Sequence, residues 1–142
     1  MLRMCRERTQ TAFTAPPVDM LHDMLHIALH VLVPLLIALF FYRSRWQRAT
    51  LIMIATMLVD VDHLLADPIY DPNRCSIGFH PLHTTPAIIL YAVLFALPLL
   101  RRWNADALDE DALDEAVRIR ALHLIGLGLL IHMALDGADC MI

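Results

Sequence analysis

The sequence predicts an all-α fold, namely an integral membrane four-helix bundle with a polar His/Asp cluster at one membrane face. Three observations predict it. The 142 residues are 58% hydrophobic and 18% charged, whereas soluble domains average about 45–50% apolar and about 25% charged residues. The apolar residues form four stretches, and the chain has eight histidines. This length suits one domain, which we place at residues 19–142, after a flexible N-terminal tail at residues 1–18.

The four apolar stretches contain 16–19 residues each, close to the minimum for crossing about 30 Å of hydrocarbon. They cover residues 24–42, 49–65, 85–100 and 122–138. A helix of a soluble bundle keeps a polar face, but residues 32–42 are apolar all round. Pro34 is tolerated in a membrane helix whose neighbours satisfy the freed carbonyl. We therefore expect four membrane-spanning helices.

The remaining segments carry weaker signals. Residues 1–18 hold three arginines but lack the apolar run of a secretory signal. Residues 104–120 contain a near-tandem Asp-Ala-Leu-Asp-Glu, typical of a solvated amphipathic helix. Without a basic tract, no nucleic-acid partner is expected. The three cysteines are odd in number and widely spaced, and they indicate neither a disulfide framework nor a Cys-x-x-Cys metal site.

The arginines indicate how the bundle crosses the membrane. All eleven basic residues are arginines, and seven lie in the two loops of one side: Arg43, Arg45, Arg48, Arg101, Arg102, Arg118 and Arg120. The positive-inside rule places these loops in the cytoplasm. We therefore expect a multi-pass protein of a bacterial inner membrane, with both termini and the 66–83 loop on the outer face.

Polar residues gather where the expected helices meet that outer face. An up-and-down bundle reverses direction at each crossing, so the starts of the first and third spans lie beside the ends of the second and fourth. These segments carry His22, Asp23, His26 and His30, then Asp60, Asp62 and His63, then His80 and His83, and finally His132, Asp136 and Asp139. Ionisable groups inside a membrane are costly and usually functional. Because His nitrogens and carboxylate oxygens bind Zn, Fe and Mn, a metal site is expected here.

Residue spacing favours the same interpretation. Residues four apart share a helical face, as in the pairs His26/His30 and His132/Asp136. In an α-helix Asp60 and His63 project together, while Asp62 points about 160° away from Asp60. One aspartate is therefore expected to bind metal and the other to orient a His ring. The roles of His22, Asp23, Cys75 and Asp139 stay open.

The order of these motifs resembles a known family. The chain reads His-x-x-x-His, then Asp60-Val-Asp62-His63, then His80-Pro-Leu-His83, then His-x-x-x-Asp. This order is similar to that of the YdjM-like membrane-bound metal-dependent hydrolases, which are small bacterial inner-membrane proteins. The resemblance covers most of the chain beyond Asp19. Val59 stands where that family has Pro, and the third motif lacks the family's Arg, which would suit a phosphate.

The resemblance implies a membrane-embedded metal-dependent hydrolase. One or two divalent ions, with zinc expected first and iron or manganese as alternatives, would lower the pKa of a bound water. The expected metal ligands are His26, His30, Asp62, His63, His83, His132 and Asp136. We expect Asp60 to act as general base or to orient a ligand, and His80 to give a proton to the leaving group. The depth of the site implies a lipid-like substrate from the bilayer, such as a lipid ester or lipid-linked phosphate.

Other classes of protein fit part of the pattern. A di-iron membrane lipid oxygenase also uses His-x-x-x-His, although the adjacent His-His typical of membrane desaturases is absent. A metal transport or sensing protein is a further alternative, but a transporter needs access from both sides, and the Arg-rich end offers no ligands along the second and third helices. A structural protein in which buried polar groups hold the helices together is the remaining alternative. A homodimer is compatible with so small a bundle.

Overall fold

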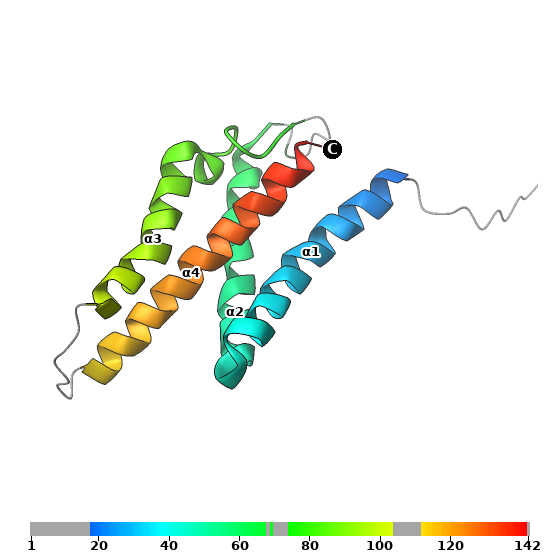
Figure 1. Cartoon of the computed structure of the whole chain (residues 1–142). Helices are drawn as coiled ribbons and strands as arrows, with labels where there is room; N and C mark the ends of the chain where they lie inside the picture. The colour runs from blue at the N-terminus through cyan, green and yellow to red at the C-terminus, as the bar shows by residue number, and fades with distance from the viewer. Residues whose placement is uncertain (1–17, 68, 70–73, 104–111, 142) are drawn as a thin grey trace, which may run out of the picture.

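Four α-helices and three 3₁₀ segments build the described chain, and no strand occurs in it. The computed structural model describes residues 18–67, 69, 74–103 and 112–141. The α-helices are α1 (Val18–Phe41), α2 (Trp46–Ala55), α3 (Thr85–Trp103) and α4 (Ala112–Asp139), and the 3₁₀ segments are η1 (Arg43–Arg45), η2 (Thr56–Leu65) and η3 (Pro81–His83). The expected all-α fold with four helices is confirmed (Figure 1).

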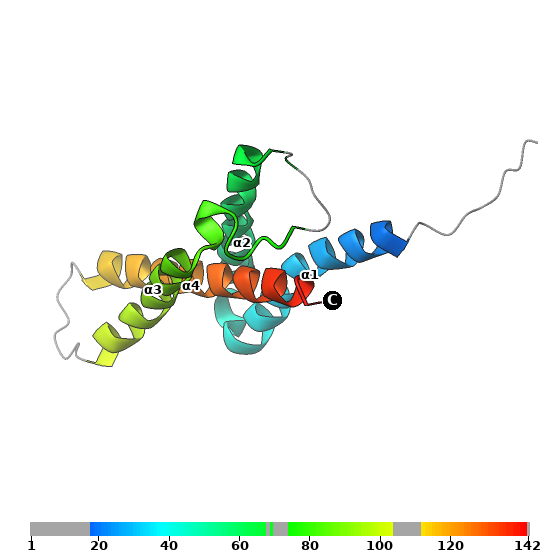
Figure 2. The same ribbon diagram turned by 90° about the horizontal axis from the view of Figure 1, so that it is seen from above.

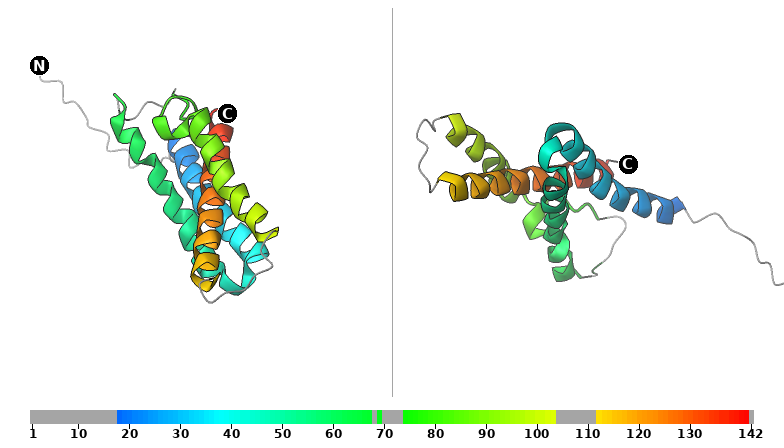
Figure 3. Two further views of the ribbon diagram at one scale, coloured as in Figure 1. Left: turned by 90° about the vertical axis from the view of Figure 1, so that its left-hand side faces the viewer. Right: turned by 90° about the horizontal axis from the view of Figure 1, so that it is seen from below.

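The last helix, α4, is the centre of the arrangement. It packs against each of the other three α-helices, and it lies between α3 and α1 in Figure 1. The side view of Figure 3 shows an elongated bundle, while the view from above shows that the helices cross at an angle rather than running parallel (Figure 2). The segment leading into α3 and the end of α4 lie at the same end of the bundle (Figure 1).

The helices differ from the four expected stretches mainly at their ends. α1 begins at Val18 rather than at residue 24, and residues 112–120 belong to α4. Residues 104–111 and the tail at residues 1–17 lie outside the described residues. The second stretch is α-helical only up to Ala55 and continues as the 3₁₀ helix η2. Such a helix turns about 120° per residue and rarely exceeds three or four residues, so η2 changes the directions of its side chains along ten residues.

A disulfide between Cys75 and Cys140 joins the segment before η3 to the residue that follows α4. The two Cα atoms lie 5.2 Å apart although 65 residues separate them in sequence. Neither the number nor the spacing of the cysteines indicated this bond. The alternation of helix direction that brings the His and Asp residues to one end brings these two cysteines there as well, so their distance in sequence is no obstacle.

Close backbone contact fixes α4 against its neighbours. A Cβ added at Gly126 would collide with the backbone of Leu94 and Phe95 on α3. A Cβ added at Gly128 would lie 2.9 Å from Met53 Cα and 2.7 Å from Thr56 Oγ1. Small residues that allow backbones to approach are typical of helix contacts within membranes. These two glycines set the position of α4, and with it that of His132 and Asp136, about one to three turns further along.

Much of the apolar surface is exposed. Leu21, Met24, Leu25 and Ile27 of α1 are each 57–61% exposed, and Phe41 is 79% exposed. Soluble monomers rarely display such continuous apolar faces. In the part of the chain that the structure describes, two helical segments are long and apolar enough to cross a membrane, Met20–Phe41 and Val117–Asp139, and the apolar part of α3, Thr85–Leu100, is shorter. The expected four spans are thus matched by two candidate membrane helices.

Candidate metal centre

Asp136, near the end of α4, lies at the centre of the polar cluster. Its side chain is 5% exposed, and each of its two oxygens faces a pair of histidines. Oδ1 lies 3.4 Å from Nε2 of His26 and 3.2 Å from Nε2 of His30. Oδ2 lies 3.1 Å from Nε2 of His83 and 3.4 Å from Nε2 of His132. One carboxylate thus joins two pairs of imidazoles supplied by α1, η3 and α4.

The other ring nitrogen of three of these histidines is held by a second group. His30 donates from Nδ1 to the backbone carbonyl of His26 at 2.9 Å. Nδ1 of His83 lies 3.3 Å from Oδ2 of Asp62, and Nδ1 of His26 lies 3.3 Å from Oδ1 of Asp139. Metal-binding histidines almost always have such a partner, which fixes the orientation of the ring and presents the opposite nitrogen to the metal.

Two of the nitrogens that face Asp136 have no hydrogen-bond partner among the described residues, namely Nε2 of His30 and Nε2 of His83. Both side chains are buried, at 3% and 0% exposure. His30 uses its Nδ1 proton on a carbonyl, so Nε2 of the neutral ring presents a lone pair to a carboxylate 3.2 Å away. Two electron-rich groups in this arrangement require a positive charge, carried either by a proton or by a metal ion.

Asp60, from η2, completes the group on one side of Asp136. Its Oδ1 lies 2.9 Å from Nε2 of His132 and 3.4 Å from Nε2 of His83. Asp60, His83, His132 and Asp136 each offer a ligand atom, and these atoms all lie within 4.8 Å of one another. His26 and His30 form a second group of this kind with Asp136. The chain therefore contains a largely buried His/Asp cluster that could hold a metal ion, while the identity of the metal stays a prediction.

Asp62 lies beside this group and contacts His83 at Nδ1, the ring nitrogen that does not face Asp136. Its Oδ2 accepts the backbone N–H of Leu82 at 2.7 Å and faces Nδ1 of His83. Its Oδ1 lies 3.2 Å from Nδ1 of His63. A third set of potential ligand atoms within 4.8 Å is formed by Asp62, His63 and His83. The sequence left open which aspartate binds metal, and the structure brings Asp60, rather than Asp62, to the Nε2 atoms of His83 and His132 that face Asp136.

The structure brings His63 and His80 together, away from Asp136. Both nitrogens of His63 are occupied, Nδ1 by Asp62 and Nε2 by the hydroxyl of Ser76 at 3.1 Å. The His80 ring stacks on that of His63 with 3.7 Å between centroids. Burial, helped by the neighbouring His63, lowers the pKa of His80. His80 therefore stacks against His63 on the side away from Asp136, and none of the potential metal groups found among the described residues includes it.

Electrostatics around His83 are dominated by its carboxylate neighbours. Burial alone would lower the pKa of this imidazole, but its contacts with Asp136, Asp60 and Asp62 outweigh burial and raise the pKa to about 10. Without metal, His83 is accordingly a cation at neutral pH. A metal ion bound at this position would replace that proton as the positive charge among the carboxylates.

Sequence reasoning missed several supporting residues. Ser76 holds His63, and the Tyr91 hydroxyl donates to the carbonyl of Leu82 at 2.9 Å, which fixes η3 on α3. Neither residue stands in a recognisable motif, so only the fold reveals them. Asp139, whose role was open, contacts both His26 and His22, at 3.3 Å each.

The fold and the site define an all-helical protein with candidate membrane helices and a His/Asp cluster able to hold metal. A family model matches residues 20–108, and by this match the chain belongs to DUF6122, a family of unknown function. The match includes Asp60 and His83 but ends before His132 and Asp136. No curated protein and no solved structure matches the chain.

Proposed function

We propose that this protein is a membrane-embedded metal-dependent hydrolase that cleaves a lipid ester or a lipid-linked phosphate. The observation that carries the proposal is the position of Asp136, whose two oxygens face His26 and His30 on one side and His83 and His132 on the other. A carboxylate between two sets of imidazoles is suited to bridging two metal ions. Two-metal sites occur in phosphatases, nucleases and aminopeptidases.

The potential ligands around Asp136 form two groups, each of which could hold one metal ion. Asp60, His83, His132 and Asp136 supply one position, and His26, His30 and Asp136 supply the other. This assignment makes Asp60 a ligand and Asp62 the group that orients His83, whereas the ligand list implied by the family resemblance contained Asp62 and not Asp60. His63 then contacts Asp62 through Nδ1, and the ring of His80 stacks on that of His63. A site of mixed imidazole and carboxylate ligands suits zinc, and also iron or manganese.

Divalent ions at these positions would supply a bound water of lowered pKa and polarise the scissile oxygen. The protein holds most of the ligands in buried, fixed positions and leaves one side of the cluster open to a substrate. His30, His83, His132 and Asp136 are at most 5% exposed, whereas the side chains of His26 and Asp60 are 29% and 41% exposed. A substrate can therefore reach the cluster from the side of α1 and η2, where Asp60 is placed to accept a proton from the attacking water.

The proposed placement has α1, α2 with η2, α3 and α4 crossing a bacterial inner membrane, with the cluster at the outer face. Two independent observations support this orientation. The arginines of η1, the start of α2, the end of α3 and the first turns of α4 lie at the opposite end, as the positive-inside rule requires of a cytoplasmic face. The Cys75–Cys140 disulfide lies at the cluster end, and disulfides persist in oxidising compartments such as the periplasm.

The test combines metal analysis with activity on the full chain. We expect the gently purified protein to contain up to two equivalents of zinc, iron or manganese, and Asp136→Asn to lose nearly all of it. The metal-loaded protein should hydrolyse at least one class among phospholipids, acylglycerols and lipid-linked phosphates. Glu115→Gln, a substitution on α4 far from the cluster, is the matched control. A metal-loaded protein that leaves every class untouched would overturn the hydrolase assignment.

A di-iron lipid oxygenase is the second candidate, because a carboxylate between His groups also suits a pair of iron ions. The same preparation separates the two functions. A hydrolase retains activity with zinc in the absence of oxygen. An oxygenase is active only with iron, and it consumes oxygen when given a lipid.

A further inference from the structure

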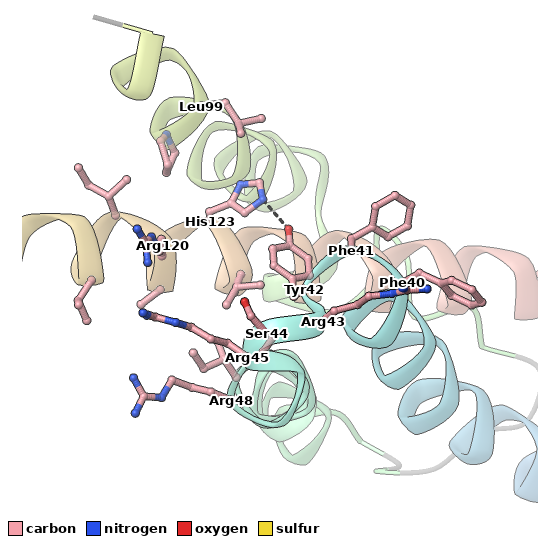
Figure 4. A pocket seen from close by; sticks show the side chains of 17 residues that line it. Phe40, Phe41, Tyr42, Arg43, Ser44, Arg45, Arg48, Leu99, Arg120 and His123 are labelled. Carbon is pink, nitrogen blue, oxygen red and sulfur yellow. Dashed lines mark hydrogen bonds between the residues drawn. The ribbon is translucent and has the colours of Figure 1, made fainter. Parts of the chain in front are cut away.

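The opposite end of the bundle contains a cavity that the metal cluster does not use. Its volume is about 770 Å³, within the range of about 300–1,000 Å³ that is usual for small-molecule sites. It lies among the end of α1, η1, the start of α2, the end of α3 and the first half of α4 (Figure 4). It is thus separated from Asp136 by several turns of α4.

The cavity combines apolar walls with a basic rim. Ile52, Leu99 and Val117 contribute to the walls, and four arginines line the cavity: Arg43, Arg45, Arg48 and Arg120. In Figure 4 Arg45, Arg48 and Arg120 extend to one side of the cavity, while Arg43 extends to the other, along Phe40. Among the residues whose side chains are described (20–67, 69, 74–100 and 117–141), no carboxylate forms an ion pair with these four guanidinium groups. Their charge and their N–H donors suit an anion.

A partly buried pair of hydrogen bonds gives the cavity a fixed inner wall. His123 donates from Nδ1 to the carbonyl of Phe95 at 3.0 Å, so its Nε2 is an acceptor. The Tyr42 hydroxyl donates to that nitrogen at 2.8 Å (Figure 4). The pair of hydrogen bonds ties the residue after α1 to α4 and α3, and it holds the cavity open between these helices.

Exposed aromatic residues place this end at the membrane surface. Phe40 and Phe41 are 67% and 79% exposed, and Trp46 is 38% exposed. Aromatic residues beside arginines are typical of the boundary between hydrocarbon and lipid headgroups. In the membrane placement proposed above, the arginines lie at the level of the headgroups of the cytoplasmic leaflet, which carries anionic lipids.

We propose that this cavity binds an anionic phospholipid. Arg45, Arg48 and Arg120 bind the headgroup phosphate, and an acyl chain lies along the apolar wall that includes Val117. Arginine forms paired hydrogen bonds with phosphate oxygens, and the apolar walls favour a lipid over a free phosphate ion. The proposal depends on the membrane placement of the proposed function but not on metal binding or hydrolysis.

The experiment is native mass spectrometry of the full chain in a non-ionic detergent. The protein is incubated with equal amounts of phosphatidylglycerol and phosphatidylcholine that have identical acyl chains. We expect the wild type to retain phosphatidylglycerol in preference, and the preference to fall about fivefold for each substitution among Arg45→Gln, Arg48→Gln and Arg120→Gln. Arg118→Gln removes the same charge from α4 outside the cavity and should keep the preference.

A second variant separates lipid from phosphate. Val117→Trp fills the cavity from a residue that is 51% exposed, so the fold should tolerate it. It should reduce retention of phosphatidylglycerol, whereas a site for free phosphate would survive it and would be blocked by excess inorganic phosphate. Equal retention of the two lipids by the wild type would overturn the proposal. So would an equal loss with Arg118→Gln, or displacement of the lipid by phosphate.

The chain's own acidic residues are the competing occupant. If residues 104–111 already neutralised the arginines, the wild type would show no lipid preference, and the combined substitution Asp106→Asn, Asp109→Asn and Asp111→Asn would create one. That outcome also rejects lipid binding by the native protein. Metal content of the same samples reports separately on the cluster at the other end. Lost lipid preference with unchanged metal therefore concerns this cavity alone.

Discussion

At the scale of single residues, Asp136 carries the largest part of the interpretation, because two of the three groups of potential ligands among the described residues include it. Asp136→Asn keeps the size of the side chain but removes the charge that both groups share. We therefore expect both metal equivalents to be lost together. Elemental analysis of the purified variant measures this directly. Loss of only one equivalent would show that the two positions are filled independently.

Substitutions of Asp60 and Asp62 should reduce metal binding in different ways. Asp60→Asn removes a ligand, so occupancy should fall even with excess metal. Asp62→Asn weakens the support of His83, and such supporting groups typically contribute about 10–100-fold in metal affinity. Full occupancy should therefore return at higher metal concentration. Titration of both metal-free variants with zinc distinguishes these results, and identical curves would contradict the assignment.

Metal affinity should fall as the pH falls. The carboxylates around His83 raise its pKa to about 10 despite burial, so at neutral pH the metal-free site holds a proton that a metal ion must displace. Between about pH 9 and pH 7 the apparent affinity should decrease about tenfold per pH unit for each proton released. Calorimetric titration in buffers of different ionisation enthalpy counts these protons. A pH-independent affinity would mean that His83 is neutral before metal binds.

At the scale of elements, η2 explains why the sequence could not settle the two aspartates. An α-helical projection turned Asp62 about 160° from Asp60. In the 3₁₀ geometry, residues three apart are eclipsed, which keeps Asp60 beside His63 at 3.6 Å. η3 then approaches Asp62 through the backbone N–H of Leu82. Hydrophobic periodicity does not distinguish the two helix types over ten residues, so this detail required the structure.

Three glycines of α4 offer a matched test of its packing. Gly126→Ala and Gly128→Ala place a methyl group against the backbones of α3 and α2, whereas at Gly137 the nearest atom, Cγ1 of Ile77, is 4.0 Å away. Overpacking typically costs about 1–3 kcal/mol. We expect the first two variants to melt at lower temperature in detergent and Gly137→Ala to melt like the wild type. Equal melting temperatures for all three variants would show that the helices can move apart to make room for the added methyl groups.

At the scale of the whole molecule, the topology of the bundle could be predicted from the sequence, but the Cys75–Cys140 disulfide could not. The reversal of direction at each span predicted that His26, Asp60, His83 and Asp136 meet at one end, and their contacts follow that pattern. The supporting contacts of Ser76 and Tyr91 depend on the path of a loop, which residue patterns do not specify. The disulfide was missed because sequence spacing, rather than position in the bundle, was used to judge the cysteines.

The orientation proposed for the bundle can be tested by labelling. In a variant whose native cysteines are replaced by serine, a cysteine at Asp67 should react with a membrane-impermeant maleimide added to intact cells. A cysteine at Ser44, at the Arg-rich end, should react only after the membrane is permeabilised. The opposite result would place the cluster and the disulfide in the cytoplasm. Reaction of both positions in intact cells would reject a membrane barrier between them.

The disulfide also has a consequence for the order of assembly. Cys75 is synthesised 65 residues before Cys140, and in the proposed placement the bond forms only after α3 and α4 have inserted and the end of α4 has reached the outer face. His83 leaves the ribosome well before His132 and Asp136. The donor set is therefore incomplete while the chain is still entering the membrane, so under the proposed function metal binds only late in biogenesis. An oxidised pair of cysteines thus marks a molecule whose insertion has already been completed.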